Sequence, residues 1–133
     1  MSKIAVRYCS KTKMGNTRRI AEAIAEGCGV EAISIAEEPK LLEAVDVLFL
    51  GGAPYANIMV PELREYAEQL EPAKVGRIVL FTTSNWSRRT VMALKKIFAA
   101  KGMVVAKDYF YSHMSKISGN MEAARKFGAD HKD

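Results

Sequence analysis

Two patterns of apolar and polar residues alternate along this chain: short apolar runs and segments with helical spacing. Five short, nearly continuous apolar runs predict buried strands, at 4–8, 30–35, 45–50, 78–81 and 103–110. Between these runs, apolar residues recur at helical spacing. Ile20, Ile24 and Cys28, for example, fall four residues apart and form one stripe. Such a pattern predicts strands that alternate with amphipathic helices.

Helix start and stop signals bound the segments between the strands. A first helix follows Gly15 and ends at the glycines 27 and 29, and a short second one is expected from Pro39 to Ala44. A third begins at Pro61. Ser87 caps a fourth, which ends at 102, and a short last helix covers 121–127. We expect residues 112–120 to be irregular.

This alternation predicts one α/β domain over residues 1–133, with a three-layer, doubly wound, five-stranded parallel sheet. In such sheets ligands bind at the carboxyl ends of the strands. The loops that leave the first, third and fourth strands, 9–17, 51–59 and 82–87, carry the unusual chemistry of the chain. We therefore expect the functional site where these three loops meet.

Composition excludes several classes of protein. Two cysteines and two histidines among 133 residues are too few for a disulfide framework or a zinc site, so we expect no metal. No signal peptide and no apolar stretch of membrane-spanning length is visible, which favours a cytoplasmic protein without a membrane partner. Nucleic acid is not an expected partner, because no nucleic-acid motif is present.

Positive charge is concentrated in the last third of the chain. Residues 1–87 contain 10 Lys/Arg and 11 Asp/Glu, whereas residues 88–133 contain 10 and 4, which gives net charges of −1 and +6. Such a basic end would attract an anionic ligand or an acidic partner, or it is simply a solvated helix face.

The loop after the first strand has the composition of a phosphate-binding site. It leads into a helix N-terminus, where amides without partners and the helix dipole favour an anion. Gly15 allows close approach of the backbone, and Lys13 offers a positive charge. Hydroxyl and amide donors come from Ser10, Thr12, Asn16 and Thr17. The P-loop pattern is absent, which disfavours a nucleoside triphosphatase.

This segment resembles the phosphate loop of the flavodoxin family, Thr/Ser-x-Thr-Gly-Asn-Thr. The match is Thr12-Lys13-Met14-Gly15-Asn16-Thr17, and the run from Asp46 to Tyr55 resembles the family's third strand and flavin loop. The resemblance covers about residues 3–110 and implies strand order 2-1-3-4-5 and bound FMN. Met14 departs from it by replacing a hydroxyl donor, and the loop has about two extra residues.

The resemblance also implies that two loops hold the flavin ring. The residues it assigns to them are Ala53, Pro54, Tyr55, Ala56 and Asn57 after the third strand, and Thr83, Ser84, Asn85 and Trp86 after the fourth. Trp86, the single tryptophan, would cover one face of the ring, or would instead pack beneath the following helix. Tyr55 is the candidate for the other face.

We therefore expect an FMN-binding redox protein that transfers electrons, as a monomer or a homodimer. Its partner would be a redox protein or a nicotinamide nucleotide donor. The alternatives are a small NAD(P)H-dependent quinone or nitro reductase, and a domain of this fold without flavin. Carrier flavodoxins are usually acidic, and this chain is not. Basic residues near the site, Lys11, Lys13, Arg18, Arg19, Arg88 and Arg89, would steer a negatively charged donor.

Overall fold

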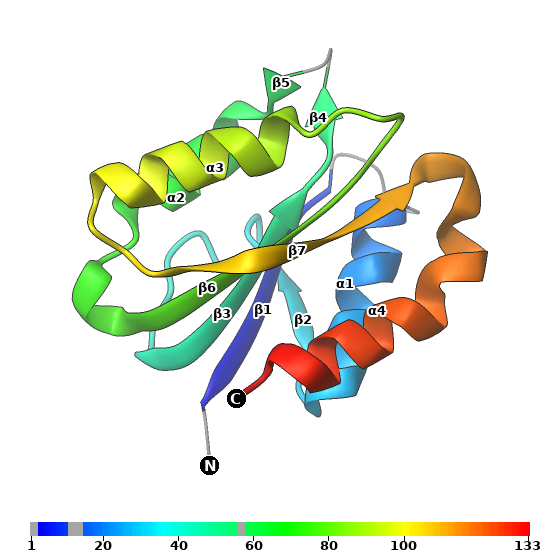
Figure 1. Ribbon diagram of the computed structural model, residues 1–133. Coiled ribbons are helices and arrows are strands. Elements are labelled where there is room, and N and C mark those ends of the chain that lie inside the picture. Colours follow the sequence, from blue (N-terminus) through cyan, green and yellow to red (C-terminus); the bar gives the residue numbers. More distant parts are fainter. Residues whose placement is uncertain (1–2, 11–14, 56–57) are drawn as a thin grey trace.

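The computed structural model describes residues 3–10, 15–55 and 58–133 and contains a five-stranded parallel sheet (Figure 1). The predicted strand order is confirmed, because the strands lie in the order β2-β1-β3-β6-β7. The strands are β1 (Ile4–Cys9), β2 (Ala32–Ser34), β3 (Val45–Gly52), β6 (Val75–Ser84) and β7 (Val105–His113). Two further short strands, β4 (Pro54–Tyr55) and β5 (Ile58–Met59), pair antiparallel after β3.

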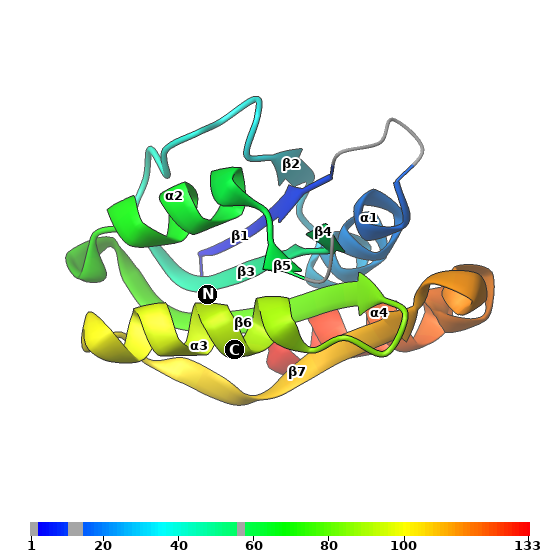
Figure 2. The same cartoon turned by 90° about the horizontal axis from the view of Figure 1, so that it is seen from above.

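Four helices cover the two faces of this sheet. They are α1 (Asn16–Cys28), α2 (Pro61–Gln69), α3 (Arg89–Ala100) and α4 (Ile117–His131). Helices α2 and α3 lie over one face, and α1 and α4 lie over the other (Figures 1 and 2). Short 3-10 turns, η1 (Pro72–Lys74) and η2 (Met114–Lys116), precede β6 and α4. This arrangement is the three-layer α/β class expected from the sequence.

Alternate residues of the central strands fill two separate cores. In β3, Leu48 and Leu50 point toward α2 and α3, whereas Val47 and Phe49 point toward α1 and α4. The same alternation occurs in β6, where Leu80 and its neighbours face opposite sides. A strand buried on both faces reads as a continuous apolar run, which explains why β3 and β6 are visible in the sequence.

Two expectations of the sequence analysis are wrong. Residues 39–44 form no helix, although Leu41 is buried. The stretch is too short to repay helix nucleation, and its neighbour Glu38 pairs with the buried Arg7 at 2.9 Å. The last helix begins at 117 rather than 121, and residues 112–113 continue β7, so most of the segment expected to be irregular is regular.

Helix α4 packs against α1 at very short range. Gly128 of α4 lies against the backbone of Ile24, and Gly27 of α1 lies against the backbone of Arg125. A β-carbon at either glycine would collide with those backbone atoms. The Cys28 thiol donates to the carbonyl of Gly128 at 3.3 Å. Two glycines therefore set the distance between α1 and α4.

Strand β7 forms one edge of the sheet. It pairs with β6 on one side, and the exposed Lys107 and Asp108 lie where this pairing is irregular, between Val105 and Tyr109. The C-terminal end of the chain in Figure 1 lies away from the carboxyl ends of β1 and β3. No helix within the described ranges combines the length and the apolar character that crossing a bilayer requires.

Candidate functional site

A cavity of about 180 Å³ opens at the carboxyl ends of β1, β3 and β6. Three loops that are far apart in the sequence meet there, as the order of the strands requires. Seven of the residues predicted to bind the cofactor line it together: Ser10, Gly15, Asn16, Thr17, Ala53, Pro54 and Thr83. The structure therefore brings the described residues of the predicted phosphate loop and parts of both predicted ring loops to one place.

The N-terminus of α1 forms one wall of this cavity. Gly15 precedes the helix in an extended conformation, and its carbonyl accepts from the amide of Arg19 at 3.2 Å. No side chain caps the helix among the described residues, and its first turn holds no acid. The amides of Asn16, Thr17 and Arg18 precede the first residue that can bond within the helix. This end of α1 therefore presents free amide donors and the positive end of the helix dipole, and no acidic residue lies in its first turn.

A buried pair of hydroxyl groups links two walls of the cavity. The Oγ1 atoms of Thr17 and Thr83 lie 2.9 Å apart, and both residues are almost fully buried. In such a pair one hydroxyl donates to the other, whose own hydrogen stays available for a further acceptor. The neighbouring Thr82 hydroxyl instead donates to the carbonyl of Gly52 at 2.7 Å. The Thr17–Thr83 pair thus offers one buried donor.

Three lining residues, Cys9, Val60 and Met114, were not among those predicted to bind the cofactor. Cys9 is the last residue of β1 and is buried; the sequence places it at the start of the loop 9–17 but gave it no binding role. Met114 comes from η2, nearly a hundred residues after the phosphate loop. Its carbonyl accepts from the Asn16 side-chain amide at 3.5 Å. The segment after β7 therefore borders the site, and no periodicity in the sequence signals this.

The loop from β6 to α3 is held by aromatic hydroxyl groups of β7. The amide of Trp86 donates to the Tyr111 hydroxyl at 2.9 Å, and that hydroxyl donates to the carbonyl of Ser84 at 3.0 Å. The Arg88 guanidinium lies 3.3 Å from the centre of the Tyr111 ring. It also donates to the Trp86 carbonyl and to the hydroxyl of Tyr109, each at 3.1 Å.

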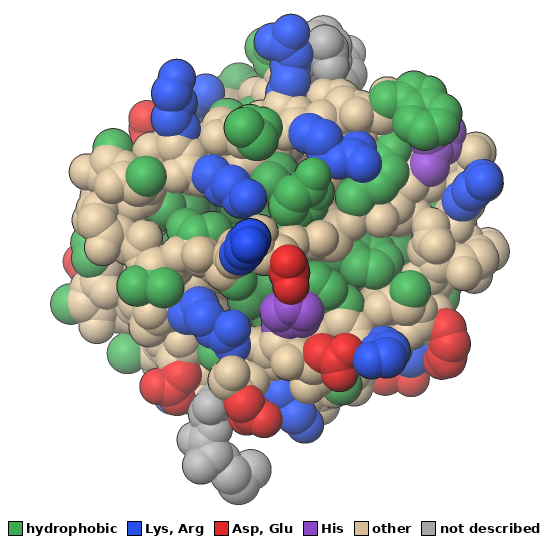
Figure 3. Space-filling view, viewed as in Figure 1, with side chains coloured by type: hydrophobic (Ala, Val, Ile, Leu, Met, Phe, Trp, Pro, Cys, Tyr) green, Lys and Arg blue, Asp and Glu red, His purple; other side chains and the backbone are tan. Residues whose placement is uncertain are grey.

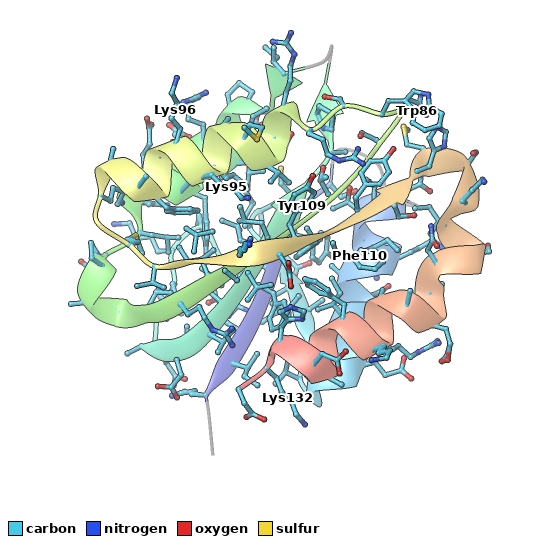
Figure 4. All side chains as sticks on the ribbon, viewed as in Figure 1. Trp86, Lys95, Lys96, Tyr109, Phe110 and Lys132 are labelled. Carbon is cyan, nitrogen blue, oxygen red and sulfur yellow. The ribbon has the colours of Figure 1, made fainter. Side chains whose placement is uncertain are left out.

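Trp86 does not pack beneath α3. Its side chain is 78% exposed at the end of the β6–α3 loop, where Figure 4 labels it. Its backbone φ of 75° is the only positive value among the described residues other than glycine. The indole ring contacts the His113 ring edge-on, with centroids 4.7 Å apart. An exposed indole on a strained backbone is available to a ligand, and such strain is frequent at functional sites.

The remaining predicted residues fall into two groups. Ser84 and Asn85 do not line the cavity: the buried Ser84 hydroxyl donates to the Ser87 carbonyl at 2.6 Å, and Asn85 is exposed. The backbone of Tyr55 belongs to β4. Thr12, Lys13, Met14, Ala56 and Asn57, together with the Tyr55 side chain, lie outside what the structure describes.

Charges near the cavity are mainly positive. Arg18 pairs with Glu22 at 3.5 Å, and Arg19 donates to the hydroxyl of Ser118 on α4 at 3.0 Å. Burial raises the pKa of Tyr8, a residue of β1, and the charge of Arg18 opposes this rise. Tyr8 therefore stays neutral at physiological pH and adds no negative charge to this end of the sheet.

Comparison with known proteins gives matches at the level of structure. No protein-family model and no curated protein sequence matches the chain. A flavodoxin from the domain Archaea superposes with a TM-score of 0.79 over 96% of this chain and 94% of its own, at 19% identity. A WrbA-like flavodoxin from Agrobacterium tumefaciens gives 0.77 over 98% and 94%, at 22% identity.

Enzymes appear among the similar structures as well. An NADH:FMN oxidoreductase in its apo form gives a TM-score of 0.66, at 14% identity, over 100% of this chain and 91% of its own. Identities this low establish the fold and do not distinguish an electron carrier from a reductase. The fold of the chain is flavodoxin-like.

Proposed function

Because the fold of the chain is flavodoxin-like, we propose that the protein binds FMN and transfers electrons through it. The observation that carries this proposal is the 180 Å³ cavity, in which the uncapped start of α1 meets the buried Thr17–Thr83 pair. Every donor there is one that a phosphate accepts from: backbone amides, hydroxyls and the Asn16 amide.

Charges at the start of α1 fit an anion. Arg18 and Arg19 lie in the first turn, close to the positive end of the helix dipole, where cations are unfavourable. A phosphate with nearly two negative charges would reverse this local imbalance. Ser10, Gly15, Asn16 and Thr17 would hold the phosphate, and Thr83 would support Thr17.

The volume of the cavity limits how much of an FMN molecule it can hold. Small-molecule pockets usually measure about 300 Å³ or more. At 180 Å³ this cavity suits the phosphate and the adjoining chain of FMN, with Met114 and Pro54 at its wall. The ring would then be held by the loops after β3 and β6, to which Tyr55 and Trp86 belong. Bound flavin would supply the redox chemistry, while the protein supplies binding, orientation and electrostatics.

Chain length does not separate a carrier from a reductase, because an NADH:FMN oxidoreductase is matched over 91% of its own length. We favour the carrier because of the hollow of about 320 Å³ that shares Cys9 and Ser10 with the phosphate cavity. Among the described residues, Glu62 and Glu65 line it and no Lys or Arg does, which does not fit the anionic phosphates of a nicotinamide nucleotide. A reductase needs a site for the nicotinamide donor next to the flavin. The expected result is that NAD(P)H consumption with a quinone stays at background.

The direct test is calorimetric titration of the purified, flavin-free protein with FMN and with riboflavin. Riboflavin lacks the phosphate, so we expect FMN to bind at least about a hundredfold more tightly, corresponding to about 3 kcal/mol. A yellow protein from which FMN is released on denaturation would agree. Equal affinity for the two flavins, or no heat with either, would overturn the proposal.

A further inference from the structure

A groove beside the predicted ring loops has an apolar floor and a basic rim. It measures about 940 Å³ and runs along α3, between this helix and the residues of β5 and α2. We call it the basic groove. Its positively charged lining residues are Arg64, Arg88, Arg89, Lys95 and Lys96. Figure 3 shows Lys and Arg side chains over α3 with hydrophobic surface between them.

The absence of acids around this groove begins in the sequence. Between Glu71 and Asp108 the chain contains eight Lys or Arg residues and no Asp or Glu. Helix α3 and both of its flanking loops lie within that stretch. No carboxylate lines the groove among the described residues. None of its cations forms an ion pair within the described ranges, so its positive charge is not compensated locally.

The cations of the groove differ in what they can do. Arg88 is held by Tyr109, Tyr111 and the Trp86 carbonyl, so it braces the loop. Lys95 points toward Tyr109 of β7, with its Nζ atom 5.2 Å from the ring centre, whereas Lys96 points away from the sheet (Figure 4). The side chains of the exposed Arg64, Arg89 and Lys96 make no hydrogen bond within the described part of the chain; Arg89 donates only through its backbone amide, to the Ser87 hydroxyl. These three are free to meet a partner.

Apolar side chains lie exposed between these cations. Met92 of α3 is 62% exposed and Ile58 of β5 is 58% exposed, and Met59, Ala93 and Ile97 form the floor beneath them. Exposed apolar residues surrounded by charge are typical of protein interfaces, in which an apolar centre is enclosed by a polar rim. Methionine adapts its shape to different partners.

Charge spacing favours a protein over a small anion. Arg89 and Lys96 are seven residues apart on α3, about 10 Å along the helix axis. Small-molecule sites are enclosed and place a few polar groups so that they converge. Here the free cations stand on the rim and the floor is apolar. This arrangement fits an extended acidic surface that also carries an apolar side chain.

We propose that the basic groove is the docking surface for an acidic redox partner protein, which inserts an apolar side chain between Met92 and Ile58. The redox part of this inference rests on the proposed function. The groove shares β5 with the first predicted ring loop, and Arg88 and Arg89 follow Trp86 in the second. A partner seated there would lie beside both loops that are proposed to hold the flavin ring.

The probe for this surface is a fluorescein-labelled peptide, Glu-Glu-Leu-Glu-Glu, and binding is measured by fluorescence anisotropy at low salt without FMN. The test variant is Arg89→Glu/Lys96→Glu. The control is Lys40→Glu/Lys126→Glu, which changes the net charge equally at exposed sites away from the groove. We expect a loss of about tenfold or more in the test variant and less than about twofold in the control.

Two further comparisons address the apolar floor. Met92→Ser keeps the charge and is expected to weaken the peptide about threefold or more, as is replacing the peptide's leucine by alanine. If circular dichroism shows that the double variant is unfolded, peptide binding is tested instead with Met92→Ser and with the single variant Arg64→Glu. Equal weakening by test and control pairs, or no effect of leucine and Met92, would overturn the proposal.

Other anions and the flavin proposal are separated in the same experiment. Tighter binding of an oligothymidylate of eight nucleotides than of the peptide would also overturn the proposal, because it would indicate a general polyanion surface. FMN titration of the same variants keeps the two proposals apart. FMN binding without peptide binding defeats only the docking surface, and peptide binding without FMN binding defeats only the flavin site.

Discussion

Two threonine hydroxyls join the phosphate loop to β6, and they give the sharpest prediction at the scale of a single residue. Thr17→Val keeps the shape of the side chain and removes its hydroxyl. A hydrogen bond to a charged group contributes about 1.5–3 kcal/mol, so we expect FMN to bind about 10- to 100-fold more weakly. Calorimetry with FMN measures the change.

The matched controls for this prediction are Thr17→Ser and riboflavin. The serine variant keeps a hydroxyl and is expected to stay within a fewfold of the unmodified protein. Riboflavin has no phosphate, so its affinity is expected to be the same in all three proteins. Normal FMN affinity in Thr17→Val would show that this hydroxyl does not contact the phosphate.

Cys28 predicts how stability depends on alkaline pH. Burial raises the pKa of its thiol to about 11, with the charge of Lys132 opposing the rise. An unfolded cysteine ionises near pH 8.5. Between that value and 11 the unfolded chain loses a proton that the folded chain keeps, so the free energy of unfolding falls. Below pH 8.5 the thiol contributes no pH dependence.

The measurement for this prediction is urea unfolding from pH 7 to 11, compared between the unmodified protein and Cys28→Ser. We expect a shallower decline in the serine variant. Tyr66, whose pKa burial raises to about 12, contributes at higher pH in both proteins. An identical decline in the two proteins would mean that Cys28 ionises equally easily folded and unfolded.

The sequence predicted much of the lining of the candidate cavity, and the missing parts have a common cause. Gly15, Asn16 and Thr17 were expected from donor chemistry at a strand end and Thr83 from the resemblance to the flavodoxin family, and all four line one cavity. Met114 was missed because its place depends on how the segment after β7 crosses the sheet. A residue brought to a site by tertiary packing leaves no local pattern.

At the scale of elements, the crossing of α1 and α4 gives a matched pair of substitutions. Gly128→Ala puts a β-carbon against the backbone of Ile24 and forces the helices apart. Overpacking of this kind typically costs about 1–3 kcal/mol. Gly119, in the same helix, has nothing within 4 Å of such a β-carbon. Gly119→Ala is therefore expected to stabilise by up to about 1 kcal/mol.

Urea denaturation followed by circular dichroism distinguishes the two variants. Opposite signs for Gly128→Ala and Gly119→Ala are the expected result. If both variants were stabilised, the close packing of α1 against α4 would be incorrect, because helix propensity alone would then determine the outcome.

Element types were predictable wherever a pattern was long, and boundaries were not. The runs that became β1, β3 and β6 are apolar because they are buried on both faces. Residues 117–120, Ile-Ser-Gly-Asn, have weak helix propensity, yet they begin α4 because Ile117 is buried in the core beneath α1. Tertiary burial overrides local preference there.

For the whole molecule, the sheet should make the two cores unfold together. Leu94 of α3 and Ile24 of α1 are both fully buried, on opposite faces of the same strands. Truncation to alanine is expected to cost about 2–5 kcal/mol at each site. Because the faces share β1, β3 and β6, we expect each variant to show one transition, with calorimetric and van't Hoff enthalpies equal. Two separate transitions would mean that the faces fold independently.

The open edge of β7 has a consequence for the solubility of the concentrated protein. An unpaired strand edge is a template on which a second chain can add its own strand and begin a fibre. Lys107 lies on this edge, where the register with β6 is irregular between Val105 and Tyr109, and stacking identical chains there would bring like charges together. Lys107→Val is therefore expected to precipitate on concentration, with light scattering rising and thioflavin staining, whereas Lys107→Arg stays clear. Continued clarity of the valine variant would mean that β7 is protected in another way.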